Sequence, residues 1–313
     1  MTVARRILVV GGSGFLGPAL LPFLRQQGYT VTNLTRCPLH DGDVGWDAKT
    51  AGDWVTHLDG AVAVINLLGA GTIRQVDTPD RRRAILDSRL DASCALSTAL
   101  RSCAAPPPVW LQAGTVALYG NAGAQPIDER HPSGEGFAAQ AARLWERSFA
   151  VSPVPAGTRK VLLRLGTVLH TQDGPLAPLA RRTRLFAGGA RGRGQQYVSW
   201  LHSADLDRIV LWALENEAAS GAYNATSPEP VTDAAFMAAL RRELRRPWSP
   251  PIPEWGVRLN ERLSGTEAGT GLASRRCLPK RLMEAGFSFL HPDLRTALHD
   301  LFSAPGAGTH ASR

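Results

Sequence analysis

Three glycines near the start of the chain form the pattern best suited to bind a charged ligand. Gly11, Gly14 and Gly17 follow a short apolar run at residues 7–10, and their spacing predicts a tight turn that opens a helix. A turn of this kind can also serve only the packing of a strand against a helix. Backbone N–H groups and the positive end of the helix dipole attract phosphate, which a Cβ would keep at a distance. The pattern therefore predicts a dinucleotide site, which also includes Ser13, Phe15 and Leu16.

The end of the second predicted strand indicates which dinucleotide fits. The strand at residues 29–34 leads into Thr35 and Arg36, without an Asp or Glu to accept hydrogen bonds from an NAD ribose. The guanidinium of Arg36 is suited to pair with a 2′-phosphate. If Arg36 is only a solvated arginine at a strand end, NAD is the alternative cofactor. The pattern favours NADP.

The elements that must position these residues alternate along the first half of the chain. Apolar periodicity predicts strands and helices in turn, which is typical of an α/β protein with a Rossmann-like, doubly wound parallel sheet. The predicted helices are residues 15–27, 80–102 and 137–150, and the further strands are 61–68, 109–112 and 160–165. We therefore expect residues 1–170 to form an NADP-binding domain.

The second half has a less regular pattern. A glycine-rich stretch at 188–194 and a proline-rich stretch at 246–253 predict loops, and helical patterns recur at 204–217, 233–245, 279–285 and 292–302. We expect residues 171–302 to form a smaller, mixed substrate domain, with 195–225 returning to the first domain. Residues 303–313, rich in Gly, Ala and Ser, predict a disordered tail.

Composition narrows the classes of function. The 313 residues carry a net charge of +8, but the arginines are scattered among Asp and Glu without an interleaved stripe of aromatics, so no nucleic-acid partner is expected. No apolar run approaches the ~18 residues that span a bilayer, so no membrane partner is expected either. The four cysteines lie far apart and lack metal-ligand spacing, so we expect no metal site and a cytoplasmic protein.

Several motifs in a fixed order resemble one known family, the epimerase-like branch of the extended, atypical short-chain dehydrogenases/reductases. The resemblance covers nearly the whole chain through residue 302 and includes a C-terminal module known only as a domain of unknown function. The motifs that carry it are ILVVGGSGFLG at 7–17, VINLLGAG at 64–71, DSRL at 87–90, LYG at 118–120, LWE at 144–146, LLRLGTVL at 162–169, GRGQQYVSWLHSADL at 192–206, NATSPEPVT at 224–232 and LPKRLMEAGFSF at 278–289.

The resemblance implies roles for further residues. It assigns the three glycines to the phosphate turn, Arg36 to the ribose phosphate, and Leu68 and Gly69 to a strand end beside the adenine ribose. We place Thr35 and Arg89 in the same cofactor site. Thr115, four residues before Tyr119, matches the serine or threonine that hydrogen-bonds a substrate carbonyl or hydroxyl in related enzymes. Its alternative role is to cap the end of a parallel strand.

The chain departs from this family at the residues that move a proton. In related dehydrogenases a Tyr-x-x-x-Lys pair does so, with the lysine lowering the pKa of the tyrosine. The corresponding positions here carry Ala138 and Ala142, and no tyrosine of this chain has a lysine four residues later. Any redox or epimerase activity must therefore use another acid or base.

Three residues are candidates for that acid or base, namely Tyr119, Glu146 and His202. His202 is preferred because histidine titrates near neutral pH. Each candidate also has a structural alternative: Tyr119 closes a loop, Glu146 pairs with Arg143 or Arg147, and His202 caps a helix.

These patterns predict an NADP(H)-binding oxidoreductase or epimerase-like protein that acts on a small polar substrate. Glu146, Arg193 and Gln196 are expected to bind that substrate. The alternative is a non-catalytic protein that senses NADP(H), because the usual proton-transfer pair is missing. A monomer or a homodimer is expected.

Overall fold

The structure is a computed structural model that describes residues 5–40, 42–69, 78–264 and 269–303. The predicted disordered tail lies outside these ranges, apart from Ser303 at the end of helix α10 (Leu294–Ser303). Across the described ranges, no helix has the length and apolar content needed to cross a membrane.

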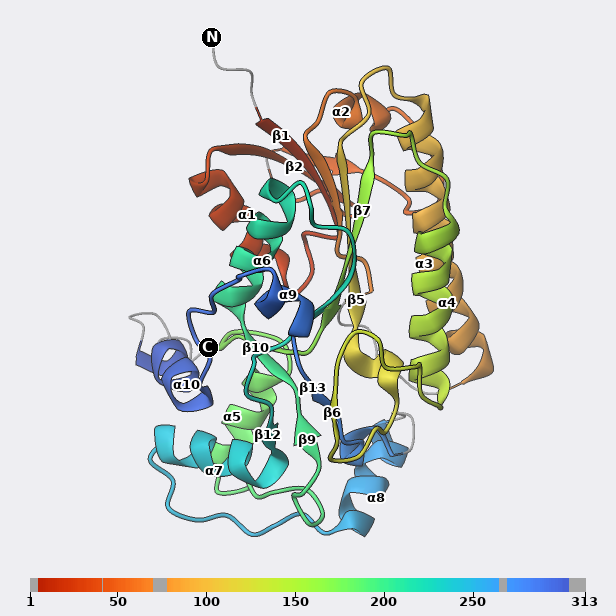
Figure 1. The fold of residues 1–313 in the computed structure, drawn as a ribbon. Helices are drawn as coiled ribbons and strands as arrows, with labels where there is room; N and C mark the ends of the chain where they lie inside the picture. The colour runs from red at the N-terminus through yellow and green to blue at the C-terminus, as the bar shows by residue number, and fades with distance from the viewer. Residues whose placement is uncertain (1–4, 41, 70–77, 265–268, 304–313) are drawn as a thin grey trace.

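A seven-stranded sheet forms the centre of the molecule (Figure 1), with the strand order β11-β7-β5-β4-β1-β2-β3. Every neighbouring pair is parallel. The strand order reverses direction between β1 and β4, which is where doubly wound sheets bind ligands. The predicted Rossmann-like α/β fold is therefore confirmed. The strands are β1 (Arg5–Val10), β2 (Tyr29–Thr35), β3 (Asp43–Gly45), β4 (Ala63–Asn66), β5 (Val109–Thr115), β7 (Arg159–Leu165) and β11 (Gly221–Ala225).

Helices cover both faces of this sheet because its strands are apolar on both faces. Ile7 and Val9 of β1 pack against one set of helices, and the intervening Leu8 and Val10 pack against the other. Figure 1 shows the two sets on opposite sides of the sheet. The first set is α1 (Gly17–Gln26) and α6 (Ser203–Glu215), and the second is α2 (Val55–Leu58), α3 (Pro79–Ser102) and α4 (Phe137–Val151).

Most element boundaries in the first half lie where the sequence pattern predicts them. The predicted strand 61–68 is too long, because the side chain of Asn66 accepts the N–H of Leu68 at 3.0 Å and turns the chain out of the sheet. The predicted strand 109–112 is too short, because β7 pairs with β5 as far as Thr115. The sequence pattern missed β3 and α2, which are too short to show a period.

The second half combines a return to the sheet with a smaller layered part. Through α6 and β11 the chain rejoins the sheet, where β11 pairs with β7. The other part has its own core around Trp200, Phe236, Leu240 and Leu298. The sequence pattern missed α5 and α8, which follow or lie beside the stretches at 188–194 and 246–253 that were predicted to be loops. The domain boundary at residue 170 stays a prediction. The remaining elements are η1 (Val116–Tyr119), β6 (Pro126–Ile127), β8 (Thr167–Leu169), α5 (Leu176–Arg184), β9 (Tyr197–Val198), β10 (Trp200–His202), β12 (Val231–Thr232), α7 (Asp233–Glu243), α8 (Glu254–Ser264), η2 (Thr270–Leu272), β13 (Arg276–Cys277) and α9 (Lys280–Glu284).

A buried carboxylate ties the C-terminal segment to α6. Asp205 is fully buried in the first turn of this helix, and its two oxygens accept the N–H groups of Leu290 at 2.6 Å and His291 at 2.9 Å. These hydrogen bonds fix the segment that leads into α10.

Removal of this carboxylate should destabilise the whole protein. In Asp205→Ala both N–H groups lose their acceptor, so we expect the free energy of unfolding, measured by urea denaturation, to fall by about 3 kcal/mol. Asp293→Ala is the matched control, because Asp293 accepts the N–H of Thr296 at the more exposed start of α10 and should cost only about 1 kcal/mol. Equal losses in the two variants would contradict this role for Asp205.

Candidate functional site

The end of β2 holds the glycine turn between β1 and α1 in shape. Gly11 has a φ of 78°, and its N–H donates to the carbonyl of Leu34. The N–H of Gly12 donates to Asn33 Oδ1 at 3.0 Å. A Cβ at Gly17 would lie 1.6 Å from the carbonyl oxygen of Gly12, so only glycine lets the start of the helix pack on the turn.

The outer side of the turn offers hydrogen-bond donors. Ser13 and Gly14 are exposed, and among the described residues the N–H groups of Ser13, Phe15 and Leu16 have no acceptor. Pro18, in the first turn of α1, has no N–H to satisfy. Unpaired N–H groups at the positive end of a helix suit phosphate oxygens. The turn therefore fits the diphosphate of a dinucleotide.

The ends of β2 and β4 flank this turn, because both strands are neighbours of β1. Ser13 Oγ donates to Thr35 Oγ1 at 2.8 Å, and Arg36 follows Thr35 on the surface. Within the described ranges the guanidinium of Arg36 makes no ion pair. On the other side Leu68 contacts the turn, since a Cβ at Gly11 would lie 3.1 Å from its Cδ2. Residues predicted to bind one cofactor thus meet at one edge of the sheet.

Arg89 holds the start of the loop after β4, residues 67–69, in place. Its side chain is buried, its Nη2 donates to the carbonyl of Gly69 at 3.0 Å, and its Nη1 donates to that of Ile85 at 3.2 Å. The guanidinium also lies over the ring of Trp145, and burial lowers the pKa of Arg89 to about 10. Gly69 has a φ of 88°, and a Cβ there would lie 2.6 Å from Arg89 Nε. Arg89 therefore positions the loop, and direct contact with a cofactor stays a prediction.

Thr115 ends β5 at the carboxyl edge of the sheet. Its Oγ1 accepts the N–H of Ala117 at 3.1 Å, so the capping role weighed from the sequence is observed. In the described structure the hydroxyl donates to no acceptor, so its proton is available to a substrate oxygen. Across from it, Ala142 on α4 is buried among apolar groups and cannot move a proton.

Tyr119 lies at the centre of a buried hydrogen-bond network. Its hydroxyl donates to Asn224 Oδ1 at 2.8 Å and accepts from Arg164 Nη1 at 2.8 Å, and the residue is 1% exposed. Burial raises the pKa of Tyr119 above its usual value, and the Arg164 guanidinium only partly opposes this. The hydroxyl is therefore neutral and enclosed, which favours a structural role, and its role as an acid or base stays a prediction.

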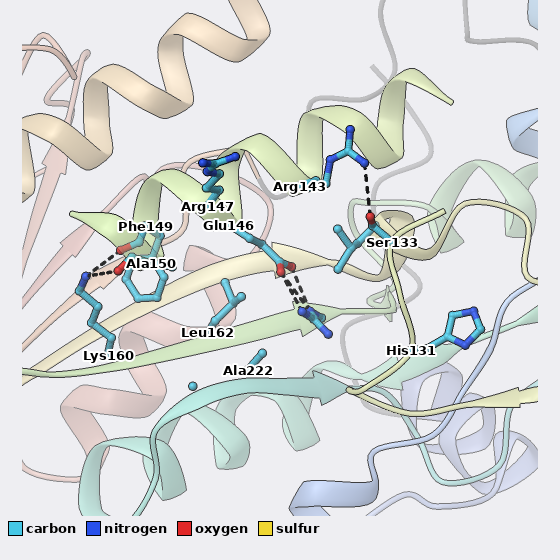
Figure 2. Close-up of a pocket in the computed structure, with 13 residues that line it drawn as sticks. His131, Ser133, Arg143, Glu146, Arg147, Phe149, Ala150, Lys160, Leu162 and Ala222 are labelled. Carbon is cyan, nitrogen blue, oxygen red and sulfur yellow. Dashed lines mark hydrogen bonds and ion pairs between the residues drawn. The ribbon is translucent and has the colours of Figure 1, made fainter. Parts of the chain in front are cut away.

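Glu146 is the ion-pair partner of Arg164. Its two carboxylate oxygens accept from the guanidinium at 3.0 and 2.9 Å, as the dashed lines in Figure 2 mark. The alternative pairing with Arg143 or Arg147 is wrong, because Glu146 pairs with Arg164 while those two exposed side chains point away from it in Figure 2. Burial raises the pKa of Glu146, and its hydrogen bonds with Arg164 oppose the shift.

Glu146 also lines a groove of about 570 Å³ beside α4, shown in Figure 2. Lys160 closes one end, where its Nζ donates to the carbonyls of Phe149 and Ala150 at 2.8 and 3.1 Å. Because the carboxylate of Glu146 is held by an arginine, it is not a free base in this groove. Its role in substrate binding stays a prediction. The lining also includes Leu118, His131, Ser133, Arg143, Arg147, Leu162, Arg164, Gly221 and Ala222.

His202 caps α6, as the structural alternative predicted. It is 3% exposed, and its Nδ1 accepts the N–H of Ala204 at 3.1 Å. The ring proton must therefore be on Nε2, which lies 3.3 Å from a carboxylate oxygen of Asp300. His202, His291 and Asp300 are close enough to ligate a metal ion together, but a protonated Nε2 has no lone pair to offer one.

Burial changes the titration of His202. Together with nearby His291, burial lowers the pKa of His202 to about 4. The expectation that this residue titrates near neutral pH is therefore wrong, because the imidazole is enclosed by segments that are distant in the sequence. Its role as a catalytic acid or base stays a prediction.

The glycine-rich loop that carries Arg193 and Gln196 is anchored to its surroundings. Gln196 Nε2 donates to the carbonyl of Arg191 at 2.9 Å. Arg191 is itself bound to the buried carboxylate of Asp233 through its N–H at 2.7 Å and its Nε at 2.9 Å. Arg193 is exposed. Contact of Arg193 and Gln196 with a substrate stays a prediction.

Reasoning from the sequence missed Arg164 and Asn224, which complete the network around Tyr119. The signal for Arg164 was an arginine inside the leucine-rich run at 162–165, which was predicted to be a buried strand. A buried guanidinium requires a carboxylate partner, so the strand predicted an ion pair even though the partner was not visible.

Comparison with known proteins shows the family of this chain. Residues 7–142 match the NAD dependent epimerase/dehydratase family, and residues 252–301 match a domain of unknown function, DUF1731. The chain is 33% identical over 298 residues to the epimerase family protein ML0860 of Mycobacterium leprae, covering 93% of this chain and 94% of that protein. It is 32% identical over 301 residues to the mouse (Mus musculus) epimerase family protein SDR39U1, covering 95% and 99% of the two chains.

Comparison with solved structures also finds epimerase family proteins. The crystal structure of human epimerase family protein SDR39U1 (isoform2) with NADPH superposes with a TM-score of 0.85 at 28% identity, over 96% of this chain and 99% of that one. UDP-N-acetylglucosamine 4-epimerase from Bacillus cereus shares the fold, with a TM-score of 0.75 at 16% identity over 99% of both chains. The family resemblance read from the motifs is confirmed.

We expect His202 to weaken the fold at acid pH. Its pKa is about 4 in the folded protein and 6.5 in a model peptide. The unfolded chain therefore binds more protons between these pH values, and the free energy of unfolding falls as the pH falls. His202→Asn keeps a capping acceptor and removes the titrating group. It should reduce the loss of stability between pH 6.5 and 4 by about 3 kcal/mol, measured by urea denaturation at each pH.

Asp207 provides the matched comparison, because its contribution to the pH dependence of the free energy of unfolding has the opposite sign to that of His202. Burial raises its pKa from 3.8 to about 7, so its contribution to stability is complete below 3.8 and is lost as the pH rises toward 7. Asp207→Asn should therefore steepen the loss of stability on acidification. Unchanged pH dependence in both variants would contradict both assignments.

Proposed function

Because this chain belongs to the NAD dependent epimerase/dehydratase family, we propose that it binds NADP(H) and acts as an oxidoreductase or epimerase-like enzyme on a small polar substrate. The observation that carries this proposal is the glycine turn, where the N–H groups of Phe15 and Leu16 have no acceptor among the described residues and Arg36 lies free of ion pairs beside them. The human relative was crystallised with NADPH, which supports the same cofactor here.

The proposed cofactor site uses three segments of the chain. The N–H groups at the start of α1 hold the diphosphate, and the Arg36 guanidinium pairs with the 2′-phosphate beside the hydroxyl of Thr35. Leu68 and Gly69 lie along the adenosine ribose, and Arg89 keeps their loop in place through the carbonyl of Gly69. When bound, the nicotinamide would supply or accept a hydride.

In this proposal Thr115 is the residue that contacts the reacting oxygen of the substrate. The N–H of Ala117 occupies one lone pair of its hydroxyl, which orients the O–H bond away from η1. The hydroxyl then donates to a substrate oxygen on which negative charge develops, and so stabilises that charge. Ala138 and Ala142 move no proton. In this proposal the proton comes from Tyr119, from His202 or from water.

A non-catalytic NADP(H) sensor is the second candidate function. It is favoured by one observation, which is that the groups able to transfer a proton are occupied elsewhere. Tyr119 is enclosed, Glu146 is held by Arg164, and His202 caps a helix. In this alternative the protein binds the same cofactor without chemistry.

Arg36 should select between the two nicotinamide cofactors. Loss of a guanidinium that pairs with a phosphate removes a charge-assisted contact that NADH does not make. We expect Arg36→Ala to weaken NADPH binding at least about tenfold and to leave NADH binding nearly unchanged, measured by calorimetric titration. Arg25→Ala, at an exposed position on the far end of α1, is the control and should change neither. Equal losses for both cofactors in Arg36→Ala would remove this assignment.

Thr115 distinguishes the enzyme from the sensor. If the protein is an enzyme, Thr115→Val should lower kcat/KM for hydride transfer about 100-fold or more, because one donor to the developing oxyanion is lost. NADPH binding should be unchanged, and Thr115→Ser should restore most of the activity. The measurement is NADPH oxidation with a panel of small carbonyl compounds. Tight NADPH binding without turnover of any compound would favour the sensor.

A further inference from the structure

Helix α8 turns its apolar side chains toward solvent. Trp255, Leu259 and Leu263 recur at every fourth residue on one face and are 71%, 47% and 80% exposed. The opposite face of α8 carries Val257 and Glu261, which are both buried. The Glu261 carboxylate accepts the N–H groups of residues 269 and 271 at 2.9 and 2.7 Å. A surface helix normally has the reverse orientation, so this apolar face requires a partner.

Further exposed apolar side chains lie at the same end of the molecule. Trp248, Leu185 and Phe186 are 67%, 73% and 51% exposed. Their two loops touch, because Arg246 Nε donates to the carbonyl of Arg184 at 3.0 Å and its guanidinium lies 4.9 Å from the ring centroid of Phe186. Figure 1 shows that α5, α7, α8 and the loop between α7 and α8 all lie at the end opposite the start of β1. We call this surface the basic apolar end, because it combines these exposed apolar side chains of α8 and the two loops with the exposed arginines described below.

Two helices at this end, α5 and α7, terminate in a left-handed residue. Phe186 has a φ of 60° and Arg245 a φ of 54°. Each is the residue just past a helix end, where the N–H of Ala187 donates to the carbonyl of Arg182 and that of Arg246 to the carbonyl of Arg241. A left-handed residue in this position is an ordinary way to end a helix.

Charge is unbalanced at the basic apolar end. Among the described residues of α5, α7, α8 and the loop that joins α7 to α8, Asp233 is bound by Arg191 and Glu261 faces the protein interior, which leaves Glu254 as the well exposed carboxylate, 3.9 Å from Arg258. Glu243 is only partly exposed. The exposed arginines of this end are Arg181, Arg182, Arg184, Arg193, Arg242, Arg245, Arg258 and Arg262.

We propose that the basic apolar end docks on the anionic lipid surface of a membrane. Indole rings and leucines insert at the level of the headgroups, and arginines pair with lipid phosphates while their stems stay on the apolar side. A second copy of the chain is disfavoured because it would bring two positively charged surfaces together. A nucleic acid is disfavoured because Leu185, Leu259 and Leu263 would make no favourable contact with its charged backbone. This is a shallow contact that needs no spanning helix. It revises the expectation that no membrane is a partner.

Vesicle binding tests this proposal directly. The purified full chain is sedimented with phosphatidylcholine vesicles that contain either no anionic lipid or about 30% phosphatidylglycerol. Binding is expected only with the anionic vesicles, and it should weaken as salt is added. The double variant Trp255→Ala/Leu259→Ala should lower the partition coefficient about tenfold or more, and Arg258→Gln/Arg262→Gln should lower it about fivefold for each arginine removed.

Matched changes on the far half of the molecule are the controls. Val151→Ala, at a 70% exposed position on α4, and Arg25→Gln/Arg101→Gln should bind vesicles like the unchanged protein. Circular dichroism checks that each variant is folded. The proposal is overturned if the full chain does not sediment with anionic vesicles, or if the control variants lose binding as strongly as the α8 variants. It is also overturned if the α8 variants lose only self-association or only retention of a single-stranded oligonucleotide. NADPH titration is independent of all these outcomes.

Discussion

The arrangement of the site depends on the ion pair and hydrogen bonds of one largely buried guanidinium, that of Arg164. It joins β7 to α4 through Glu146, to η1 through the hydroxyl of Tyr119, and to the loop before α4 through the carbonyl of Glu129. A largely buried charge without these partners would be costly, so the network favours this arrangement of the four segments. Thr115 lies at the start of the same η1, so its position follows from the network.

This network has a consequence for the chemistry of the site. Tyr119 and Glu146 are both engaged with Arg164, and α4 carries no Tyr-x-x-x-Lys pair. Among the described residues of the site, the polar groups that stay open are the Thr115 hydroxyl and the backbone N–H groups of the glycine turn. These bind and orient oxygen atoms well but transfer protons poorly near neutral pH. The site is therefore better equipped to hold a cofactor and to polarise a substrate than to act as an acid or base.

Arginine has different tasks in different parts of this molecule. Arg164 and Arg89 are largely buried and organise the site through carboxylate and carbonyl oxygens. Those around α5 and α8 are exposed and accompany exposed aromatic and leucine side chains. The net charge of +8 thus arises from groups of two kinds, and only the exposed group can serve contacts with other molecules.

The sequence by itself determined the parallel sheet and the glycine turn, because both depend on local patterns. Apolar runs of strand length, helical periodicity and glycines at positions of close backbone approach act over a few residues. Only the tertiary structure decided the partner of Glu146, because Arg164 lies on strand β7 and Glu146 on helix α4, and these two elements meet only when the helix packs on the sheet. It also decided the low pKa of His202, which arises from burial and from His291, 89 residues further along. For α8, the sequence contains an apolar stripe, but which face points to solvent depends on where the rest of the chain packs.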